Sequence, residues 1–329
     1  MLQPQLKQSR IIISIAFAGA ILLIGLLYYF SEYMFVEAEK DRTEQNPETV
    51  ILTSDSVHDQ SWGSHAFYSQ IHLEEHFDAD VEIYPNLTTD MLKEFRTEKE
   101  LDNTADIIIG HGGEFSEVFK KYAPQHPDTE FVTLHGDSAH ANHTVYTFDI
   151  TDAETRALIS GAEISTTKKI GVLGKEGDWQ GYDEIKSTLE NFYEDIEIMY
   201  ETVDSRNDKG EALEALDVLL EGGADVIYSR GNMFNRYVID QARKRDFYVI
   251  GFIEDQAYLG EGCVLTSVVV DIPAIYERMM SDYLSGDGLP GNVQRLTLED
   301  SVYGISSFGP MFTEEELYRV NEKIDMLQE

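Results

Sequence analysis

The stretch that decides the fold is YVIGFIEDQAYLGEGCVLTSVVVD, residues 248–271. Two apolar runs rich in β-branched residues, Tyr248–Phe252 and Val264–Val270, flank an acidic loop that contains glycine. This pattern predicts two buried strands joined by a polar connection. Strands and helices alternate before the stretch, and one helix and a short tail follow it. We therefore expect the chain to cross back here to an earlier lobe, with the Asp255-Gln256 loop at the crossing.

The segments before this stretch alternate between predicted strands and predicted helices. Predicted strands cover residues 49–53, 81–84, 106–109, 130–134, 144–148, 169–173, 197–201 and 224–228, and predicted helices lie between most of them. Strict alternation indicates parallel sheets with helices on both faces. Ligands of such sheets bind beyond the carboxyl ends of the strands. Two lobes whose strand ends face each other would enclose a hinged cleft.

These patterns predict an α/β fold with two Rossmann-like lobes behind one transmembrane helix. The expected divisions are a cytoplasmic N-terminus (1–10), an anchor (11–30), a stalk (31–48), a first lobe (49–150 plus 253–286) and a second lobe (151–252 plus 287–329).

The expected anchor is Ile11–Phe30, which contains no charged residue. Twenty residues at about 1.5 Å per residue span about 30 Å, the thickness of the bilayer core. Lys7 and Arg10 precede the segment, so the positive-inside rule places the N-terminus in the cytoplasm and the rest of the chain outside it. A cleaved signal peptide is the alternative, and Val36-Glu37-Ala38 loosely fits its cleavage site. The apolar run exceeds the roughly 7–15 residues of a signal-peptide core, which favours the uncleaved anchor.

The charge balance excludes one class of partner. Lysine and arginine number 25 against 61 aspartates and glutamates, a formal charge of −36. Such a chain repels phosphate backbones, so we expect no direct contact with nucleic acid. The single cysteine, Cys263, precedes a predicted buried strand, and a small core residue is its expected role.

All nine histidines fall between His58 and His143. His72-Leu73-Glu74-Glu75-His76 fits an H-x-x-E-H zinc-protease pattern, but nothing in the sequence supplies an evident third ligand. We expect Phe67, Ile71 and Phe77 to form the core face of this helix, with the histidines toward solvent. The prediction is that no metal binds.

Catalytic and nucleotide-binding motifs give no support to an enzyme. Gly110-His111-Gly112-Gly113 follows a buried strand but lacks the full glycine pattern and the lysine of a phosphate loop. No Ser-His-Asp or Cys-His set stands in a recognisable motif. We predict neither catalysis nor a cofactor.

Several polar or aromatic side chains are expected at the strand ends that face the cleft. His111 and His135 follow adjacent strands and could donate hydrogen bonds, whereas Trp62 could stack on a planar ligand or pack as a core aromatic near the helix start. The candidate ligand-binding set is Asp55, His58, Asp59, Trp62, His111, His135, Asn232, Asp255, Gln256 and Ser267.

Several of these residues lie in segments that resemble a known family. Asp55–Gly63, Gly223–Tyr228, Gly251 with Asp255-Gln256, and Leu265–Val268 resemble, in order, the basic membrane protein family of solute-binding proteins, which includes purine-nucleoside-binding (PnrA-like) lipoproteins of ABC importers. Four segments are similar to its Med subgroup of Bacillus competence regulators in particular, namely Gly110–Gly112, Phe115–Phe119, Asp128–Val132 and Asp255–Glu261. The resemblance implies a type I periplasmic-binding-protein fold.

Three departures from the family pattern bear on function. The lipoprotein cysteine is absent. The family's acidic residue two positions before Asp255 is here Ile253, and its lysine three positions after Ser267 is here Val270. In the nucleoside binders that the chain resembles, those two groups hold the sugar.

Two functions follow as alternatives. The first is a membrane-anchored extracytoplasmic sensor or positive regulator of competence, with a small-molecule ligand and a membrane partner protein. The second is the substrate-binding protein of a nucleoside ABC importer. A hydrolase, which would need metal-dependent turnover, has the least support.

Overall fold

The computed structural model describes residues 46–175, 177 and 181–327, and the residues from Glu48 onward form one compact unit. The expected anchor at 11–30 and the stalk as far as residue 45 lie outside the described residues. Within the described part, no helix is both long enough and apolar enough to cross a bilayer.

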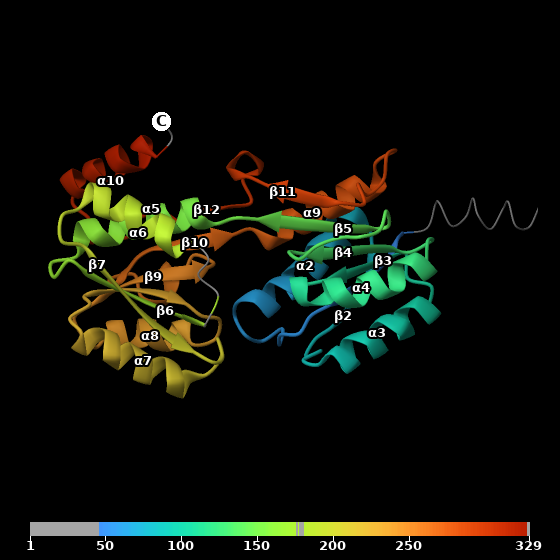
Figure 1. The fold of residues 1–329 in the computed structure, drawn as a ribbon, viewed down its shortest axis with the longest axis horizontal. Helices are drawn as coiled ribbons and strands as arrows, with labels where there is room; N and C mark the ends of the chain where they lie inside the picture. Colours follow the sequence, from blue (N-terminus) through green and yellow to red (C-terminus); the bar gives the residue numbers. More distant parts are fainter. Residues whose placement is uncertain (1–45, 176, 178–180, 328–329) are drawn as a thin grey trace, which may run out of the picture. The chain divides into compact units, whose positions relative to one another are not determined.

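The first sheet has six parallel strands in the order β11-β5-β4-β3-β1-β2 (Figure 1). Its strands are β1 (Glu48–Leu52), β2 (Asp80–Tyr84), β3 (Ile107–Gly110), β4 (Glu130–Leu134), β5 (His143–Phe148) and β11 (Val293–Leu296). The associated helices are α2 (Trp62–Phe77), α3 (Asp90–Asp102), α4 (Ser116–Tyr122) and α9 (Ile272–Leu284). Short 3-10 turns flank α4, at Gly113–Phe115 and Ala123–Gln125.

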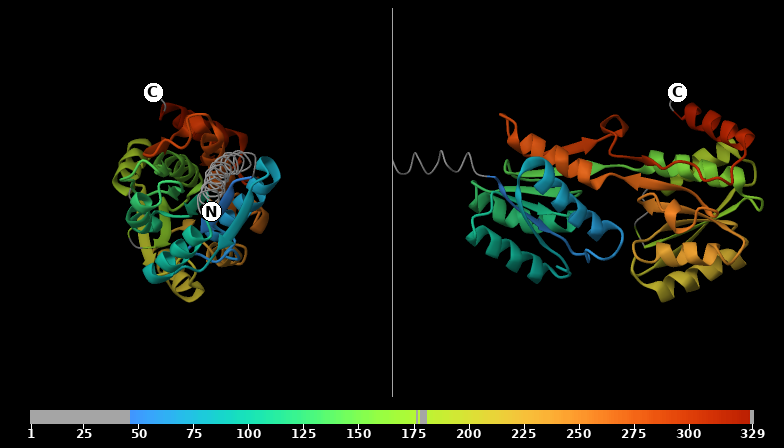
Figure 2. Two further views of the ribbon diagram at one scale, coloured as in Figure 1. Left: turned by 90° about the vertical axis from the view of Figure 1, so that its right-hand side faces the viewer. Right: turned by 180° about the vertical axis from the view of Figure 1, so that it is seen from behind.

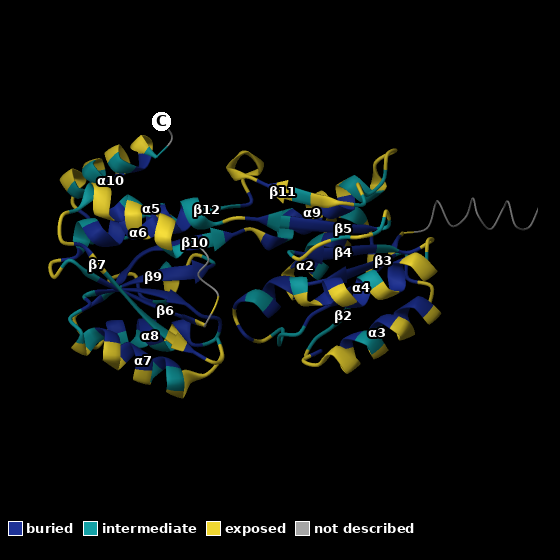
Figure 3. Ribbon diagram, in the orientation of Figure 1, coloured by how far each residue is buried: buried dark blue, intermediate teal, exposed yellow. Residues whose placement is uncertain are grey.

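Both faces of this sheet are buried, because successive side chains of a strand point to opposite sides. Val50, Leu52 and Ile108 pack with α3 and α4, whereas Ile51 and Ile109 pack with α2 and α9. The unbroken apolar runs of the sequence reflect this two-sided burial. Figure 3 shows the buried strands between partly exposed helices.

The second sheet has the order β12-β10-β9-β8-β6-β7. Its strands are β6 (Lys169–Lys175), β7 (Glu197–Val203), β8 (Val226–Arg230), β9 (Tyr248–Ile253), β10 (Val264–Val270) and β12 (Tyr303–Ile305). They are parallel except for β12, which runs antiparallel to β10. The helices are α5 (Thr151–Ile164), α6 (Tyr182–Phe192), α7 (Lys209–Glu221), α8 (Asn235–Ala242) and α10 (Glu314–Met326), with 3-10 turns η3 (Ala257–Leu259) and η4 (Leu298–Asp300).

The two-lobe α/β architecture confirms the predicted alternation, but the strand pairing corrects the expected lobe boundaries. The expected first lobe includes residues 253–286, yet β10 pairs with β9 and extends the second sheet. The crossing comes after β10, at Asp271, because α9 then packs on α2 of the first lobe. The expected second lobe also includes residues 287–329. Within that range β11 pairs instead with β5 in the first sheet, whereas β12 and α10 do join the second lobe.

Three chain segments therefore connect the lobes (Figures 1 and 2). The first lies between β5 and α5, at 149–150. The second is Asp271, between β10 and α9. The third, residues 297–302, runs from β11 to β12 and contains η4. All three lie where the chain leaves one sheet for the elements of the other.

The core face of α2 also differs from the prediction. Phe67 and Ile71 are 41% and 36% exposed, whereas His65 is 9% exposed. Phe77, the third residue of the predicted face, does pack against the hydrophobic core. The buried residues of the helix are Gly63, Ser64, His65, Ala66, Ser69 and Leu73. Most of these are small, so they let α9 approach closely; hydropathy alone favours the bulkier stripe. His72, expected toward solvent, contacts Glu277 of α9 at 3.0 Å.

Candidate functional site

The two lobes meet through loops that follow β1 and β8. Ser61 Oγ donates a 3.2 Å hydrogen bond to Asn232 Oδ1, and both residues are buried. Nearby, Arg236 Nη1 donates to Gln60 Oε1 at 2.9 Å. These loops leave the carboxyl ends of parallel strands, where α/β sheets bind their ligands. Asn232, one of the predicted site residues, thus faces the first lobe directly.

Asp59 is fully buried at the start of α2. Its Oδ1 accepts from the backbone N–H of Ser61 and Ser64, each at 2.9 Å, and Oδ2 accepts from the N–H of Gly63 at 2.9 Å. The Ser64 hydroxyl also donates to Oδ1, at 3.0 Å. Both carboxylate oxygens therefore satisfy N–H groups that the first turn of a helix leaves without partners. Asp59 shapes the site by fixing this loop.

Trp62 and His111 are bonded to each other in both directions. The indole Nε1–H of Trp62 donates to the carbonyl oxygen of His111 at 2.9 Å, and His111 Nε2 lies 2.8 Å from the carbonyl oxygen of Trp62. A carbonyl only accepts, so His111 carries its proton on Nε2. Nδ1 is then an acceptor for the Tyr276 hydroxyl at 2.8 Å. Burial lowers the pKa of His111 to about 3, which keeps the ring neutral.

His135 extends this aromatic group. Its ring centroid lies 6.4 Å from that of Trp62, in a stacked arrangement, and 4.4 Å from that of Phe148. Nδ1 is 3.0 Å from Thr147 Oγ1. Burial lowers the pKa of His135 to about 4. The two histidines that the sequence placed at adjacent strand ends therefore both contact Trp62 as neutral rings.

Asp55 is the carboxylate of the site whose pKa is shifted from its ordinary value. Burial, followed by the negative charges of Asp59 and Glu114, raises its pKa to about 6. Arg206 and Lys175 oppose this shift from the second lobe. A partly buried carboxylate among like charges favours a ligand that donates a hydrogen bond or carries positive charge. His58, in the same loop, is exposed.

Some predicted site residues of the second lobe are buried and hold strands together, whereas another is exposed. Gln256 is buried: its Oε1 accepts from the N–H of Phe252 at 3.3 Å, and its own N–H donates to Ser267 Oγ at 3.1 Å. These hydrogen bonds join β9 to β10. They occupy polar groups of Gln256 and Ser267, two residues that the sequence analysis predicts to contact a ligand. Asp255, in contrast, is exposed, and its Oδ1 accepts from the N–H of Ala257 at 3.1 Å.

A buried charged cluster at the end of β8 was not predicted. Arg230 Nε lies 2.7 Å from Glu154 Oε1, and the Tyr228 hydroxyl donates to the same oxygen at 2.8 Å. The guanidinium carbon lies 5.2 Å from the centre of the Phe252 ring. An arginine that ends an apolar strand, as in Tyr228-Ser229-Arg230, was the signal available in the sequence. Its partner Glu154 lies 76 positions earlier in sequence number, on α5, which no local pattern reveals.

The site thus comprises three groups. Asp55 and Asp59 shape the β1 loop, Trp62, His111 and His135 form the aromatic group, and Asn232 joins the first lobe to the second. Gln256 and Ser267 bond to each other within the second lobe, while His58 and Asp255 are exposed. Neutral imidazoles, an indole, an amide and a perturbed carboxylate can orient a polar planar molecule. Among the described residues, no three His, Cys, Asp or Glu side chains form a metal-binding group.

Known proteins resemble this chain over most of its length. Residues 46–328 match the Bmp family model, described as ABC transporter substrate-binding protein PnrA-like. The chain is 27% identical over 288 residues to the transcriptional activator protein Med of Bacillus subtilis (strain 168), covering 83% of this chain and 86% of Med. It is 24% identical over 299 residues to basic membrane protein A of Borreliella afzelii, covering 85% and 88% of the two chains.

Solved structures share the fold. A transcriptional activator of the comK gene from Bacillus halodurans superimposes with a TM-score of 0.74 at 23% identity, covering 84% of this chain and 96% of that one. An ABC transporter solute-binding protein from Conexibacter woesei DSM 14684 gives a TM-score of 0.68 at 17% identity, covering 86% and 96%. These similarities establish the two-lobe, type I periplasmic-binding-protein-like architecture.

Proposed function

We propose that this chain, which belongs to the Bmp family of PnrA-like substrate-binding proteins, is a membrane-anchored extracytoplasmic sensor that acts as a regulator rather than as the receptor of an importer. The family consists of solute-binding and regulatory proteins, not of enzymes. The similarity to Med supports the regulatory role. A charge of −36 disfavours contact with DNA, so we propose that regulation passes through a partner protein at the membrane.

One observation carries the choice between sensor and importer. At the two positions where the family resemblance puts sugar-binding charges, this chain has Ile253 and Val270, which are only 5% and 3% exposed. Both side chains belong to the hydrophobic core. They offer a ribose no hydrogen bond, so they favour a ligand other than a nucleoside.

The proposed ligand site lies between the carboxyl ends of the two sheets. We propose that Asp55, His58, Trp62, Asn232 and Asp255 contact the ligand. In this proposal Asp59, Gln256 and Ser267 hold the loops that carry those side chains. His111 and His135 position the indole of Trp62, since both rings contact it.

The nucleoside importer remains the second candidate, because the family description is that of an ABC transporter component. Mass spectrometry of small molecules that co-purify with the full chain separates the two roles. We expect a ligand that is not a purine nucleoside. Recovery of a nucleoside in stoichiometric amount would favour the importer.

The proposed location has its own test. The relatives named basic membrane proteins support membrane association, and the charge-free segment 11–30 supplies the anchor in our proposal. Protease added to intact cells that express the full chain is expected to digest the domain from residue 46 onward. A domain that stays intact until the cells are lysed would contradict an extracytoplasmic location.

A further inference from the structure

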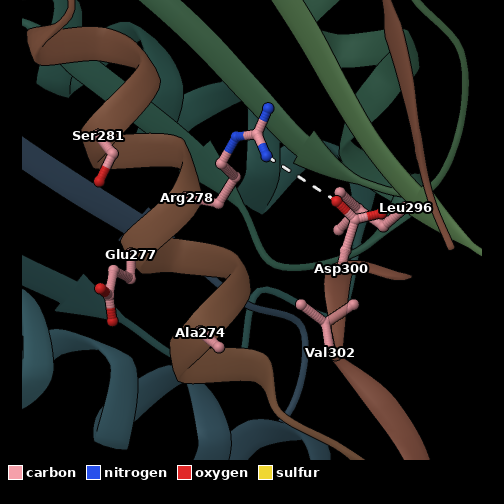
Figure 4. Close-up of a pocket in the computed structure, with 7 residues that line it drawn as sticks. All are labelled: Ala274, Glu277, Arg278, Ser281, Leu296, Asp300 and Val302. Atoms are coloured by element: carbon pink, nitrogen blue, oxygen red, sulfur yellow. Dashed lines mark ion pairs between the residues drawn. The ribbon is translucent and has the colours of Figure 1, made fainter. Parts of the chain in front are cut away.

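A cavity of about 300 Å³ lies between α9 and the segment that runs from β11 toward β12. Figure 4 shows its seven lining residues, which are Ala274, Glu277, Arg278, Ser281, Leu296, Asp300 and Val302. None of them belongs to the candidate site described above. The third connection between the lobes, residues 297–302, lines this cavity with Asp300 and Val302, and α9, which begins just after the connection at Asp271, lines it from the other side. Its volume is at the lower end of the range for ligand sites, which suits a small molecule.

Side chains of opposite charge line the two sides of the cavity. Arg278 on α9 and Asp300 on η4 point toward each other across the cavity in Figure 4, with Nη1 and Oδ1 3.9 Å apart. A direct charge-assisted hydrogen bond would be about 2.7–2.9 Å long. Each of the two residues also has a hydrogen-bond partner on its own side of the cavity. Arg278 Nε donates to both carboxylate oxygens of Asp282 at 2.9 Å, and Asp300 Oδ2 accepts from the Thr297 N–H at 2.7 Å.

Two other polar residues line the cavity, Glu277 and the exposed Ser281. Glu277 Oε2 lies 3.0 Å from His72 Nε2 of α2. Arg278 and Asp300 are the two lining residues of opposite charge that face each other, so they are the pair suited to a ligand with both charges. Buried Leu296 and Val302 and half-buried Ala274 form the apolar part of the lining.

We propose that this cavity binds a small zwitterion, namely a free amino acid with an aliphatic side chain. The guanidinium of Arg278 receives the carboxylate, for which its planar fork is suited. Asp300 Oδ1 accepts from the ammonium group. The aliphatic side chain lies on Leu296 and Val302, where it leaves water. This site is separate from the proposed function, which concerns the carboxyl ends of the sheets.

The decisive experiment titrates the full chain with L-leucine and two analogues that each lack one charge. 3-Methylbutan-1-amine keeps the ammonium group alone, and 4-methylpentanoate keeps the carboxylate alone. We expect L-leucine to bind in calorimetry and each analogue to bind at least ~10-fold more weakly, because each loses one charge-assisted contact. An absence of leucine binding up to about 10 mM would overturn the proposal. Equal binding of either analogue would also overturn it.

Three variants locate the site. Asp300→Asn retains an oxygen that can accept from Thr297 but loses the charge, and Arg278→Gln removes the guanidinium; each is expected to weaken leucine at least ~10-fold. Ala274→Leu fills the cavity and should abolish binding. Arg245→Gln, which removes the surface ion pair of Arg245 with Asp217, is the matched control and should bind as the parent does. Thermal unfolding without ligand checks that each variant folds. Unchanged binding by folded Ala274→Leu would place leucine elsewhere and refute the site.

Discussion

His111 and Trp62 exchange two hydrogen bonds, each between a ring nitrogen of one residue and the carbonyl oxygen of the other, at 2.8 and 2.9 Å. This exchange ties the end of β3 to the first residue of α2. It also fixes the protonation of a histidine that burial keeps neutral. The site is therefore built around an imidazole that acts as a neutral donor and acceptor.

The first prediction is that unfolding free energy falls as the pH is lowered from about 6.5 toward 4. Burial lowers the pKa of His111 to about 3 and the pKa values of His135 and His143 to about 4, from the ordinary histidine value of 6.5. In this window the unfolded chain binds more protons, so acid favours unfolding, by up to about 1.4 kcal/mol per pH unit for each histidine. Urea unfolding at several pH values measures the slope. His111→Gln should flatten it, whereas the same slope in parent and variant would contradict the assignment. The exposed His58→Gln serves as the control.

Asp55 predicts the opposite sign. Its pKa is raised to about 6 from 3.8, so the folded state binds more protons between these values and the carboxylate destabilises the fold as pH rises through them. Asp55→Asn should therefore stabilise the protein by about 1–3 kcal/mol at pH 7 and by much less near pH 4. Asp90→Asn, at an exposed first-turn aspartate of α3, is the comparison in the same urea experiment. A stability gain that does not change with pH would count against the raised pKa.

Asp59→Ala should destabilise the protein by about 2 kcal/mol or more, because several donors at the start of α2 lose their acceptor inside the structure. Asp59→Asn should cost less, since one oxygen remains. Denaturant unfolding gives both values. If Asp59→Ala left stability unchanged and altered only ligand affinity, Asp59 would be a contact residue and not a structural one.

Ile253 has a backbone φ of +73°, a region that β-branched residues rarely adopt. Glycine tolerates this conformation, so Ile253→Gly should be more stable than Ile253→Ala by about 1 kcal/mol. Both variants lose the same buried contacts except for one methyl group. Val249 is a buried residue of the same strand and does not have a positive φ. At this position we expect Val249→Ala to be more stable than Val249→Gly. Thermal unfolding of the four variants tests this reversal, and the same order at both positions would exclude strain at Ile253.

Adenosine, guanosine and inosine should bind at micromolar concentrations or more weakly. Each charge-assisted hydrogen bond that Ile253 and Val270 cannot make is worth roughly 1.5–3 kcal/mol. Two such losses reduce affinity about a hundred- to ten-thousand-fold. Calorimetric titration of the full chain measures this, and submicromolar binding of any of the three would restore the importer as the preferred function.

The two-lobe α/β architecture could be predicted from the sequence, because β1, β3 and β10 are continuous apolar runs. Such runs indicate strands that are buried on both faces of a sheet. The prediction from sequence was wrong where the packing of a helix depends on a partner that is distant in the chain. The stripe of Phe67 and Ile71 is more hydrophobic than the face that α2 buries, and only the arrival of α9, some 200 positions later in sequence number, selects the smaller residues. Most of the candidate residues lie in loops at strand ends, as the sequence predicted, whereas Ser267 lies within β10 and Trp62 begins α2. Their individual roles depend on local hydrogen bonds. Asp59 and Gln256 have the composition of ligand contacts, yet backbone N–H groups occupy their oxygens.

The pairing of β11 with β5, and of β12 with β10, has a consequence for dissecting the molecule. Each sheet takes an edge strand from the last part of the chain, after both lobes have begun. No single cut in the gene therefore separates two complete lobes, and a protein shortened before residue 293 lacks a strand from each of them. A nonsense mutation late in the reading frame damages both halves together, and an exchange of one lobe between relatives must splice the chain at all three connections.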